Sequence, residues 1–187
     1  MQKLNTRTLI SLCAIIITMG LMGCDKIFPP SGDLVERVSD GDTIKVKQAN
    51  GQEFSVRFAC MDAPEVPHSK KERDSKSLSD RNQFGWGEKA QARLKSLIQK
   101  NSDRVTLKIT DSDRYGRKVA EVRLKDGTFA QEVLIREGLA KVYRPYLNKC
   151  PSRAIVEQAE AEAKQQKRGV WGDAKFVNPW EYRSLGK

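Results

Sequence analysis

Residues 34–59 alternate between apolar and polar side chains with the period of two that is typical of β-strands. The dipeptide Asn50-Gly51 interrupts this alternation, and it favours the tight turn of a β-hairpin. The pattern predicts three strands before any helix. The apolar positions on which this prediction depends are Ile44, Val46, Phe54, Val56 and Phe58.

A helical period begins further along the chain. Apolar residues at the spacing of one helix face predict a helix over residues 87–100. Two further alternating segments, residues 105–109 and 119–124, predict two more strands. The apolar face of the predicted helix consists of Ala90, Leu94, Leu97 and Ile98.

The last third of the chain contains signals for helix ends. Thr128 and Gln131 have the spacing of a capping box, which predicts a helix that begins there and ends at Gly138. Residues 139–144 indicate a short strand, and residues 152–168 indicate a last helix.

Three strands, a helix and two strands are the element order of an OB-fold, a five-stranded β-barrel. The prediction is therefore an α+β protein with an OB-fold barrel and three helices. Because the order alone also fits other small α+β folds, the fold prediction depends on the motifs described below as well.

The first 23 residues have the organisation of a secretory signal peptide. Lys3 and Arg7 precede an apolar run, residues 9–22, that is shorter than the roughly 20 residues a spanning helix needs. The run ends at Cys24 in a sequence that resembles the lipobox of bacterial lipoproteins. The resemblance implies cleavage before Cys24 and attachment of lipid to it. A signal peptide with an incidental cysteine is the alternative.

Residues 24–33, with Pro29-Pro30, predict a short tether between this lipid anchor and a domain over residues 34–187. The expected location is the cell envelope, with the protein anchored to a bacterial membrane and facing the periplasm or the exterior.

Charge and composition narrow the classes of function. The 187 residues include 34 Lys and Arg against 24 Asp and Glu, a formal net charge of +10 that favours a polyanionic partner. A Cys/His zinc site has too few ligands, because the chain has one histidine and four cysteines. A nucleophile paired with histidine would depend on His68, which we expect to be a loop residue.

Acidic residues occur in two short motifs at strand ends. Asp40 and Asp42 flank a glycine before the second predicted strand, and Asp62 and Glu65 follow the third. Carboxylates brought together from neighbouring strands could supply several of the roughly six to eight oxygens that Ca²⁺ binds. Taken alone, each motif is more typical of a solvated turn.

Two arginines change that interpretation. Arg57 lies on the face of its strand opposite Val56 and Phe58, five residues before Asp62, and Arg117 lies in a later predicted hairpin. A guanidinium fork matches the oxygens of a phosphate, so two of them beside a cation would form a phosphodiester site. For Arg57 alone, an ordinary surface position is the alternative.

Together these motifs resemble the staphylococcal-nuclease-like family, the thermonucleases, over residues 34–182. They occur in the family's order and near its spacings. The resemblance implies an OB-barrel that cuts DNA and RNA with Ca²⁺ and leaves 3′-phosphate products. The matching stretches are residues 40–43, 57–65, 113–117, 138–142 and 169–171.

The resemblance also implies a role for each site residue. Glu65 matches the glutamate that positions or deprotonates the attacking water. Arg57 and Arg117 match the two arginines that hold the scissile phosphate. The family's calcium ligands match Asp42, Asp62 and the backbone carbonyl of Ala63, with Asp40 as a nearby supporting acid.

Two features depart from the family pattern. Ala63 stands where the family often has threonine, and the change should be tolerated because the ligand is a backbone carbonyl. Residues 66–86 are longer than in the best-known member and predict a solvated, mobile loop. Alternatively, this segment contacts the phosphates of a longer substrate through Lys70, Lys71, Arg73, Lys76 and Arg81.

Aromatic residues and cysteines leave alternatives open. Tyr115, Tyr143 and Tyr146 are candidates for a base-stacking surface, and packing within the protein is an equal alternative for each. Cys60 and Cys150 are the thiols that would remain after lipidation, and in an exported protein they favour a disulfide. Two free thiols are the alternative.

The function predicted from the sequence is a monomeric, Ca²⁺-dependent nuclease that acts on DNA and RNA. The first alternative is a non-catalytic OB-fold envelope lipoprotein that binds nucleic acid, because such barrels bind widely and a basic surface is sufficient. The second is a structural factor of the cell envelope, which explains the charge and the anchor but not the recurring acids and arginines.

Overall fold

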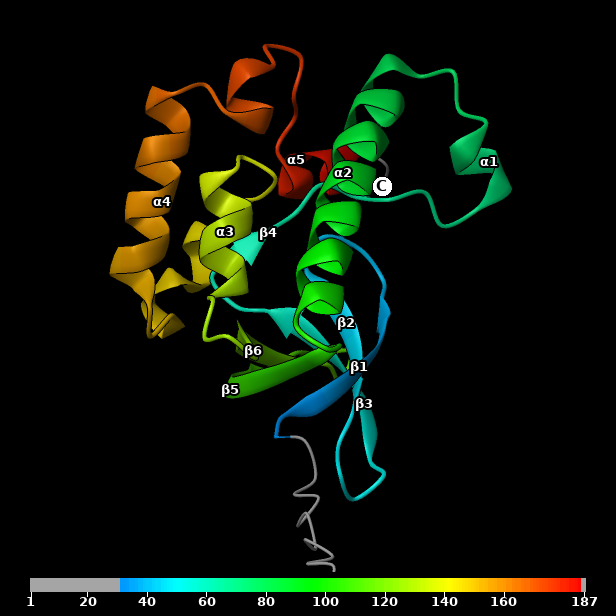
Figure 1. Ribbon diagram of the computed structural model, residues 1–187. Coiled ribbons are helices and arrows are strands. Elements are labelled where there is room, and N and C mark those ends of the chain that lie inside the picture. Colours follow the sequence, from blue (N-terminus) through cyan, green and yellow to red (C-terminus); the bar gives the residue numbers. More distant parts are fainter. Residues whose placement is uncertain (1–30, 186–187) are drawn as a thin grey trace, which may run out of the picture. The chain divides into compact units, whose positions relative to one another are not determined.

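The computed structural model describes residues 31–185, which we call the described domain. The predicted signal peptide, Cys24 and most of the predicted tether lie outside the described residues. Figure 1 shows the helices and strands of the domain.

Five strands of the domain form a closed barrel in the order β1-β2-β3-β6-β5 (Figure 1). Neighbouring strands are antiparallel except β3 and β6, which are parallel. The predicted α+β class and OB-fold barrel are confirmed. The strands are β1 (Asp33–Val38), β2 (Thr43–Lys47), β3 (Glu53–Phe58), β5 (Arg104–Ser112) and β6 (Lys118–Leu124).

The apolar positions of the alternating segments fill the barrel interior, because every second side chain of a strand lies on the same face. Ile44 and Val46 of β2 and Val56 of β3 have no exposed surface. Phe58 is 1% exposed and is among the largest fully buried side chains. The alternation therefore reports the core-facing side of each strand.

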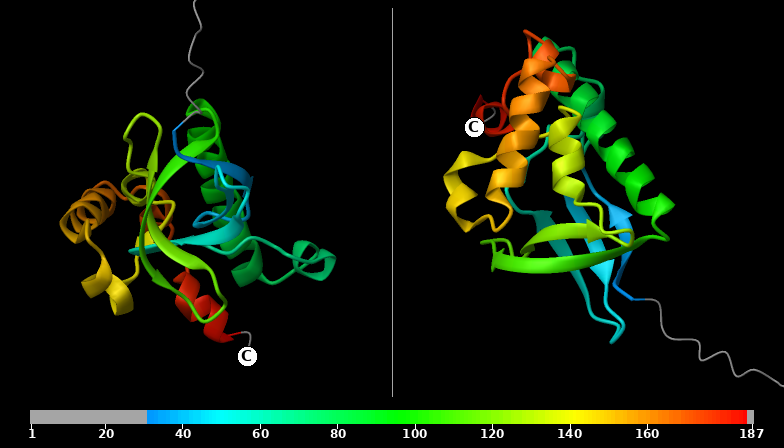
Figure 2. Two further views of the ribbon diagram at one scale, coloured as in Figure 1. Left: turned by 90° about the horizontal axis from the view of Figure 1, so that it is seen from below. Right: turned by 60° about the vertical axis from the view of Figure 1, so that its left-hand side comes forward.

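Three helices lie beside one another on the same side of the barrel (Figure 2). They are α2 (Leu78–Lys100), α3 (Ala130–Arg136) and α4 (Arg153–Gln165). No helix of the described domain is long and apolar enough to cross a membrane. The remaining elements are β4 (Met61–Asp62), α1 (Lys70–Arg73), β7 (Lys141–Val142), η1 (Arg144–Lys149), η2 (Gly169–Gly172) and α5 (Pro179–Leu185).

The predicted loop over residues 66–86 is wrong in its second half, because α2 begins at Leu78 rather than Gly87. Tertiary contacts stabilise these early turns. Asn82 and the indole of Trp86 donate hydrogen bonds to Asp173 at 2.7 and 2.9 Å. The first half of the segment contains α1, which has no buried residue.

The predicted capping box at Thr128 is also wrong. The N-cap of α3 is Phe129, and no side chain caps this helix. Gln131 is fully buried, and its amide donates to the carbonyl of Ala120 at 2.9 Å and accepts from the N–H of Val122 at 3.1 Å. Gln131 therefore joins α3 to the barrel instead of closing the end of its own helix.

A disulfide links Cys60, in the turn between β3 and β4, to Cys150, before α4. Both residues are buried, and they are 90 positions apart in the chain. The carboxylate of Glu121 lies 4.0 Å from each sulfur and accepts a hydrogen bond from the N–H of Ser152 at 2.6 Å. The bond therefore connects the turn next to Asp62 with the helical side of the domain.

Candidate active site

Two aspartates and an arginine meet where β2 begins and where β3 and β4 end. Asp42 directly precedes β2, and its neighbour Thr43 pairs with Arg57 across β2 and β3. Asp62 belongs to β4. The aspartates are only 1% and 0% exposed, and Arg57 donates a hydrogen bond to each of them. The structure therefore brings together three of the residues that the sequence assigned to the site.

The turn that contains Asp42 packs tightly against its surroundings. Asp40 accepts a hydrogen bond from the N–H of Asp42 at 2.9 Å, as in an Asx-turn. A side chain on Gly41 would lie 2.7 Å from the Cβ atoms of both Ala63 and Ala90, so only glycine fits there. Asp42 in turn accepts from the N–H of Ala63 at 2.6 Å. The two acidic motifs are thus joined through the backbone of one and the side chain of the other.

Glu65 is positioned by helix α2. A Cβ on Gly87 would lie 2.0 Å from the carbonyl oxygen of Glu65, which shows how closely the helix approaches this loop. The amide of buried Gln83, oriented to satisfy both of its partners, accepts from the N–H of Glu65 at 3.2 Å and donates to the carbonyl of Val177 at 3.1 Å. The side chain of Glu65 remains 25% exposed, so water can reach it.

Burial and charge act against each other in this cluster. Burial raises the pKa of Asp42 well above its ordinary value, although the cation of Arg57 opposes the shift. Burial also disfavours the charged form of Arg57, but Asp42 and Asp62 outweigh it and raise the Arg57 pKa. Asp42 therefore depends on positive charge to remain ionised in the fold.

Arg183 of helix α5 is a site residue that the sequence analysis missed. It donates to Asp62 at 2.6 Å and to Glu65 at 2.5 Å. Burial opposes its charge, but these acids raise its pKa. Seven residues are too few to show a helical period, and Pro179 at the start of α5 was the only local signal available.

Arg117 lies in the turn between β5 and β6 and is held by a different acid. Its guanidinium donates to Asp113 at 2.7 Å, and hydrogen bonds from Arg117 lower the pKa of Asp113 despite partial burial. Arg57 pairs with Val119 across β3 and β6, and Arg117 is two residues before Val119. The structure therefore brings Arg117 to the start of the strand beside Arg57 but does not show the two arginines on a common partner.

The residues present fit a hard divalent cation. Asp42 and Asp62 supply carboxylate oxygens close enough for one guanidinium to contact both, and Ala63 adds a buried backbone carbonyl between Asp62 and Glu65. Carboxylates and carbonyls are the ligands that Ca²⁺ prefers. The raised pKa of Asp42 is a second indication, because a cation bound there would offset the cost of the buried charge.

The candidate tyrosines fall into two groups. Asp62 pairs with Lys141 across β4 and β7. Tyr143 directly follows β7 and is two residues after Lys141. The Tyr143 ring centroid lies 5.7 Å from those of Tyr146 and Trp180. Tyr115 lies instead on the β5–β6 turn, is 68% exposed, and contacts Arg114 and Arg117.

His68, which the sequence analysis expected to be a loop residue, lies just before α1. It is exposed, and its backbone N–H donates to Glu72 at 2.6 Å. Among the described residues, its imidazole makes no hydrogen bond with the acidic cluster, by which we mean Asp40, Asp42, Asp62 and Glu65.

Comparison with known proteins agrees with the fold. The sequence model of the family described as staphylococcal nuclease homologue matches residues 55–173. The chain is 35% identical over 149 residues to an uncharacterized endonuclease of Escherichia coli O157:H7, covering 80% of this chain and 82% of that protein. It is 33% identical over 161 residues to a micrococcal nuclease of Shigella flexneri, covering 82% and 80%. It is 36% identical over 149 residues to endonuclease YncB of Bacillus subtilis (strain 168), covering 76% and 63%.

The barrel, the acidic cluster and these similarities define a phosphodiester hydrolase that acts on nucleic acid. The chain belongs to the staphylococcal nuclease homologue family.

Proposed function

We propose that this nuclease is a Ca²⁺-dependent enzyme that cuts both DNA and RNA and leaves 3′-phosphate ends. The observation that supports it most is the buried pair Asp42 and Asp62 with Arg57 donating to both. Two ionised carboxylates are costly to bury unless cations offset them. A site of this kind favours a divalent cation bound next to a phosphate-binding arginine.

The roles of the residues follow from their positions. When bound, Ca²⁺ would polarise a phosphoryl oxygen and offset the charge that develops in the transition state. Glu65, which is partly exposed, would orient the attacking water and accept its proton. The new bond joins the water oxygen to phosphorus, the bond to the 5′-oxygen breaks, and that oxygen takes up a proton. Arg57 and Arg117 would donate to the other phosphate oxygens.

An aromatic group beside the site suits unpaired bases. Tyr143, Tyr146 and Trp180 lie next to one another, and Tyr146 is 59% exposed. Aromatic faces bind bases of DNA and RNA with little sequence preference. We therefore assign the contacts with the nucleotides that flank the scissile bond to this group rather than to Tyr115.

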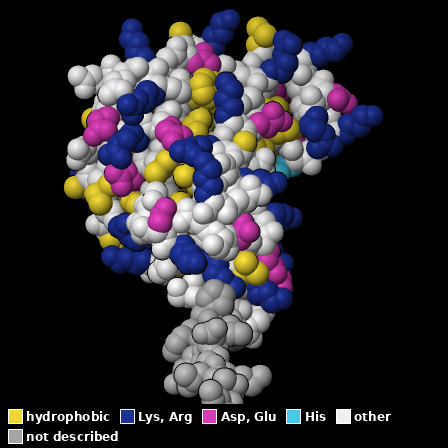
Figure 3. Space-filling model, in the orientation of Figure 1, with side chains coloured by type: hydrophobic (Ala, Val, Ile, Leu, Met, Phe, Trp, Pro, Cys, Tyr) yellow, Lys and Arg dark blue, Asp and Glu magenta, His cyan; other side chains and the backbone are white. Residues whose placement is uncertain are grey.

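The basic surface and the first residues of the chain suggest where the enzyme acts. Lys and Arg side chains are spread over the face shown in Figure 3, in keeping with a net charge of +10. Such a surface attracts nucleic acid with a strength that falls as salt is added. With the lipobox-like sequence at Cys24, it supports a monomeric lipoprotein of the cell envelope that meets nucleic acid outside the cytoplasm.

The first experiment incubates the purified full chain, in mild detergent, with plasmid DNA and with RNA in Ca²⁺, in Mg²⁺ and in EDTA. We expect cleavage in Ca²⁺ that EDTA abolishes, and product ends that a polymerase extends only after phosphatase treatment. An Arg57→Ala protein controls for contaminating nucleases. A folded protein that retards nucleic acid without cutting it in any cation would instead support the non-catalytic alternative.

The anchor is tested separately. Cells that produce the protein are labelled with a radioactive fatty acid and then fractionated. We expect label on the wild-type protein in the membrane fraction and none on Cys24→Ala. An unlabelled wild-type protein would reject the lipoprotein assignment without affecting the nuclease.

A further inference from the structure

Helix α5 connects to the acidic cluster through Arg183. The two Nη atoms of this arginine lie 3.3 and 2.6 Å from the two carboxylate oxygens of Asp62, and one of them also donates to Glu65 at 2.5 Å. Arg57 donates to the first of the same Asp62 oxygens. Both oxygens of Asp62 are therefore already occupied by guanidinium groups.

A divalent cation bound by Asp62 must compete with these guanidinium groups. The cluster contains four carboxylates, from Asp40, Asp42, Asp62 and Glu65, and two guanidinium groups, so its formal charge is negative and favours a cation. The oxygen of Asp62 that Arg57 leaves free is the one at 2.6 Å from Arg183. Cation binding therefore competes with the Arg183 contact at this oxygen.

Arg183 is the arginine that can leave. The side chain of Arg57 is 21% exposed and projects from β3, a strand paired on both sides within the closed barrel. The side chain of Arg183 is 40% exposed and projects from a helix of seven residues. Displacing Arg183 breaks its bonds with one buried aspartate and one partly exposed glutamate, whereas displacing Arg57 breaks its bonds with two buried aspartates.

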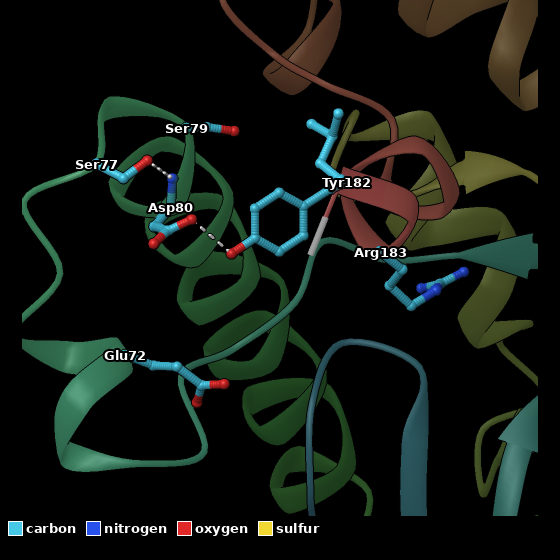
Figure 4. A pocket seen from close by; sticks show the side chains of 7 residues that line it. Glu72, Ser77, Ser79, Asp80, Tyr182 and Arg183 are labelled. Atoms are coloured by element: carbon cyan, nitrogen blue, oxygen red, sulfur yellow. Dashed lines mark hydrogen bonds between the residues drawn. The ribbon is translucent and has the colours of Figure 1, made fainter. Parts of the chain in front are cut away.

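Other residues of α5 hold the helix in place independently of Arg183. The hydroxyl of Tyr182 donates to Asp80 of α2 at 2.9 Å, and its ring packs edge-on against Phe84. In Figure 4, Tyr182 and Asp80 approach each other while Arg183 points away from Asp80. Trp180, on the same helix, contacts Tyr143. A released guanidinium therefore stays beside Glu65 and the aromatic group.

We propose that Arg183 is a third arginine of the active site. In the cation-free protein it pairs with Asp62 and Glu65; when a divalent cation takes its place on Asp62, the guanidinium binds a phosphate of the nucleic acid. A planar guanidinium fork matches the oxygens of a phosphate group. The cation thus prepares the site in two ways. Its own charge offsets that of the phosphate, and its binding frees Arg183 from Asp62 to contact the substrate. This inference rests on the cation dependence proposed above.

The test compares Arg183→Gln with the wild-type full chain in detergent. Calorimetric titration with Ca²⁺ in the absence of nucleic acid should give about tenfold tighter binding in the variant, because a competing cation has been removed. Cleavage of a short single-stranded DNA at saturating Ca²⁺ should show a KM about tenfold higher, because a phosphate contact has been lost. Lys175→Gln removes an equal charge from the loop before α5, outside the site, and should leave both the Ca²⁺ affinity and the KM unchanged.

Two variants separate this role from a structural one. Arg183→Lys keeps the charge without the fork and should give Ca²⁺ affinity near the wild type but a raised KM. Tyr182→Phe loosens α5 and leaves the guanidinium in place, so it should lower the melting temperature without tightening Ca²⁺ binding. If Arg183→Gln behaves like Tyr182→Phe, Arg183 only docks the helix and the inference is wrong.

The remaining outcomes are also decisive. Unchanged or weaker Ca²⁺ binding by Arg183→Gln overturns the exchange, and an unchanged KM overturns the contact with substrate. If the wild-type protein cuts nucleic acid but binds a divalent cation other than Ca²⁺, the Ca²⁺ assignment fails, and the same titrations with that cation decide the inference. If it binds no divalent cation, both proposals fail.

Discussion

Gly87 of helix α2 lies against the backbone of Glu65 so closely that a Cβ there would be 2.0 Å from the Glu65 carbonyl oxygen. Gly85, one position before Trp86 in the same helix, has no neighbouring atom within 4 Å of the corresponding point. The two glycines therefore form a matched pair for testing whether α2 positions Glu65.

Gly87→Ala should destabilise the protein by about 1–3 kcal/mol, the usual cost of overpacking, and should lower kcat by displacing Glu65. Gly85→Ala should instead stabilise it by roughly 1 kcal/mol, because alanine is the better helix former. Urea unfolding and steady-state cleavage measure both effects. Equal stability of the two variants would show that the helix does not approach the loop as the structure indicates.

Arg57 and Arg117 should separate catalysis from stability. Replacing either by alanine should lower kcat by roughly 10²–10³-fold, the usual effect of removing one donor to a developing oxyanion. Without a divalent cation, Arg57→Ala should also lower the free energy of unfolding by roughly 3 kcal/mol, because it leaves buried aspartates less compensated. The pair of Arg117 with Asp113 is more exposed, so Arg117→Ala should cost less than about 1 kcal/mol.

Chemical denaturation in EDTA and again in Ca²⁺ measures the loss of unfolding free energy in Arg57→Ala and in Arg117→Ala. A Ca²⁺ concentration of about 100 times Kd should add about 2.7 kcal/mol to the stability of the wild type. A fully active, folded Arg57→Ala protein would contradict the assignment of Arg57 to the reaction.

The raised pKa of Asp42 makes the stability of the cation-free protein depend on pH. A carboxyl whose pKa is higher in the folded state than its ordinary value of 3.8 binds protons more readily in the folded state. Its contribution is therefore most favourable below pH 3.8 and declines as the pH rises through the folded-state pKa. Most other carboxyl groups with a shifted pKa have a lowered pKa, as Asp113 does, and they stabilise the fold more as the pH rises.

Asp42→Asn should remove the free-energy cost of keeping the buried Asp42 carboxylate ionised at neutral pH. In EDTA at neutral pH we expect its melting temperature to equal or exceed that of the wild type, whereas in Ca²⁺ the order should reverse because the variant lacks a ligand. Thermal melts at several pH values, with and without Ca²⁺, measure this. A variant that is less stable than the wild type in EDTA at every pH would show that Asp42 is favourably ionised in the fold.

Reduction of the disulfide between Cys60 and Cys150 should destabilise the domain. Because the bond closes a loop across 90 positions, the chain-entropy model gives about 4.6 kcal/mol. Melting with and without a reducing agent measures the effect, and a Cys60→Ser, Cys150→Ser protein should be insensitive to the reagent. Alkylation of Cys60 and Cys150 in the unreduced protein would show that the bond does not form.

The sequence predicted the barrel because the alternation of apolar residues is a local pattern. Alternation identified β2 and β3 through residues such as Ile44 and Val56, and neither position has exposed surface in the structure. Asp42 and Asp62 were assigned to the site by the motif resemblance, since each acidic motif alone is more typical of a solvated turn. The motif resemblance then joined segments that periodicity alone could not relate.

The features that the sequence analysis missed depend on contacts between distant segments. The first turns of α2 are polar, and their partner Asp173 is more than 85 positions away. Gln131 was assigned to a cap because its spacing fits one, whereas the barrel offered it two buried backbone groups. Arg183 has no recognisable pattern around it, so only the folded chain shows its contact with Asp62.

That contact can form only after the segment between its two residues has been synthesised. Arg183 and Asp62 are 121 positions apart, and the whole of β5, β6, α3 and α4 is translated between them. While a ribosome is still adding those elements, the nascent chain holds the acidic motifs without Arg183 or the aromatic partner Trp180. Until α5 has been synthesised, the nuclease lacks the contact of Arg183 with Asp62 and that of Trp180 with Tyr143.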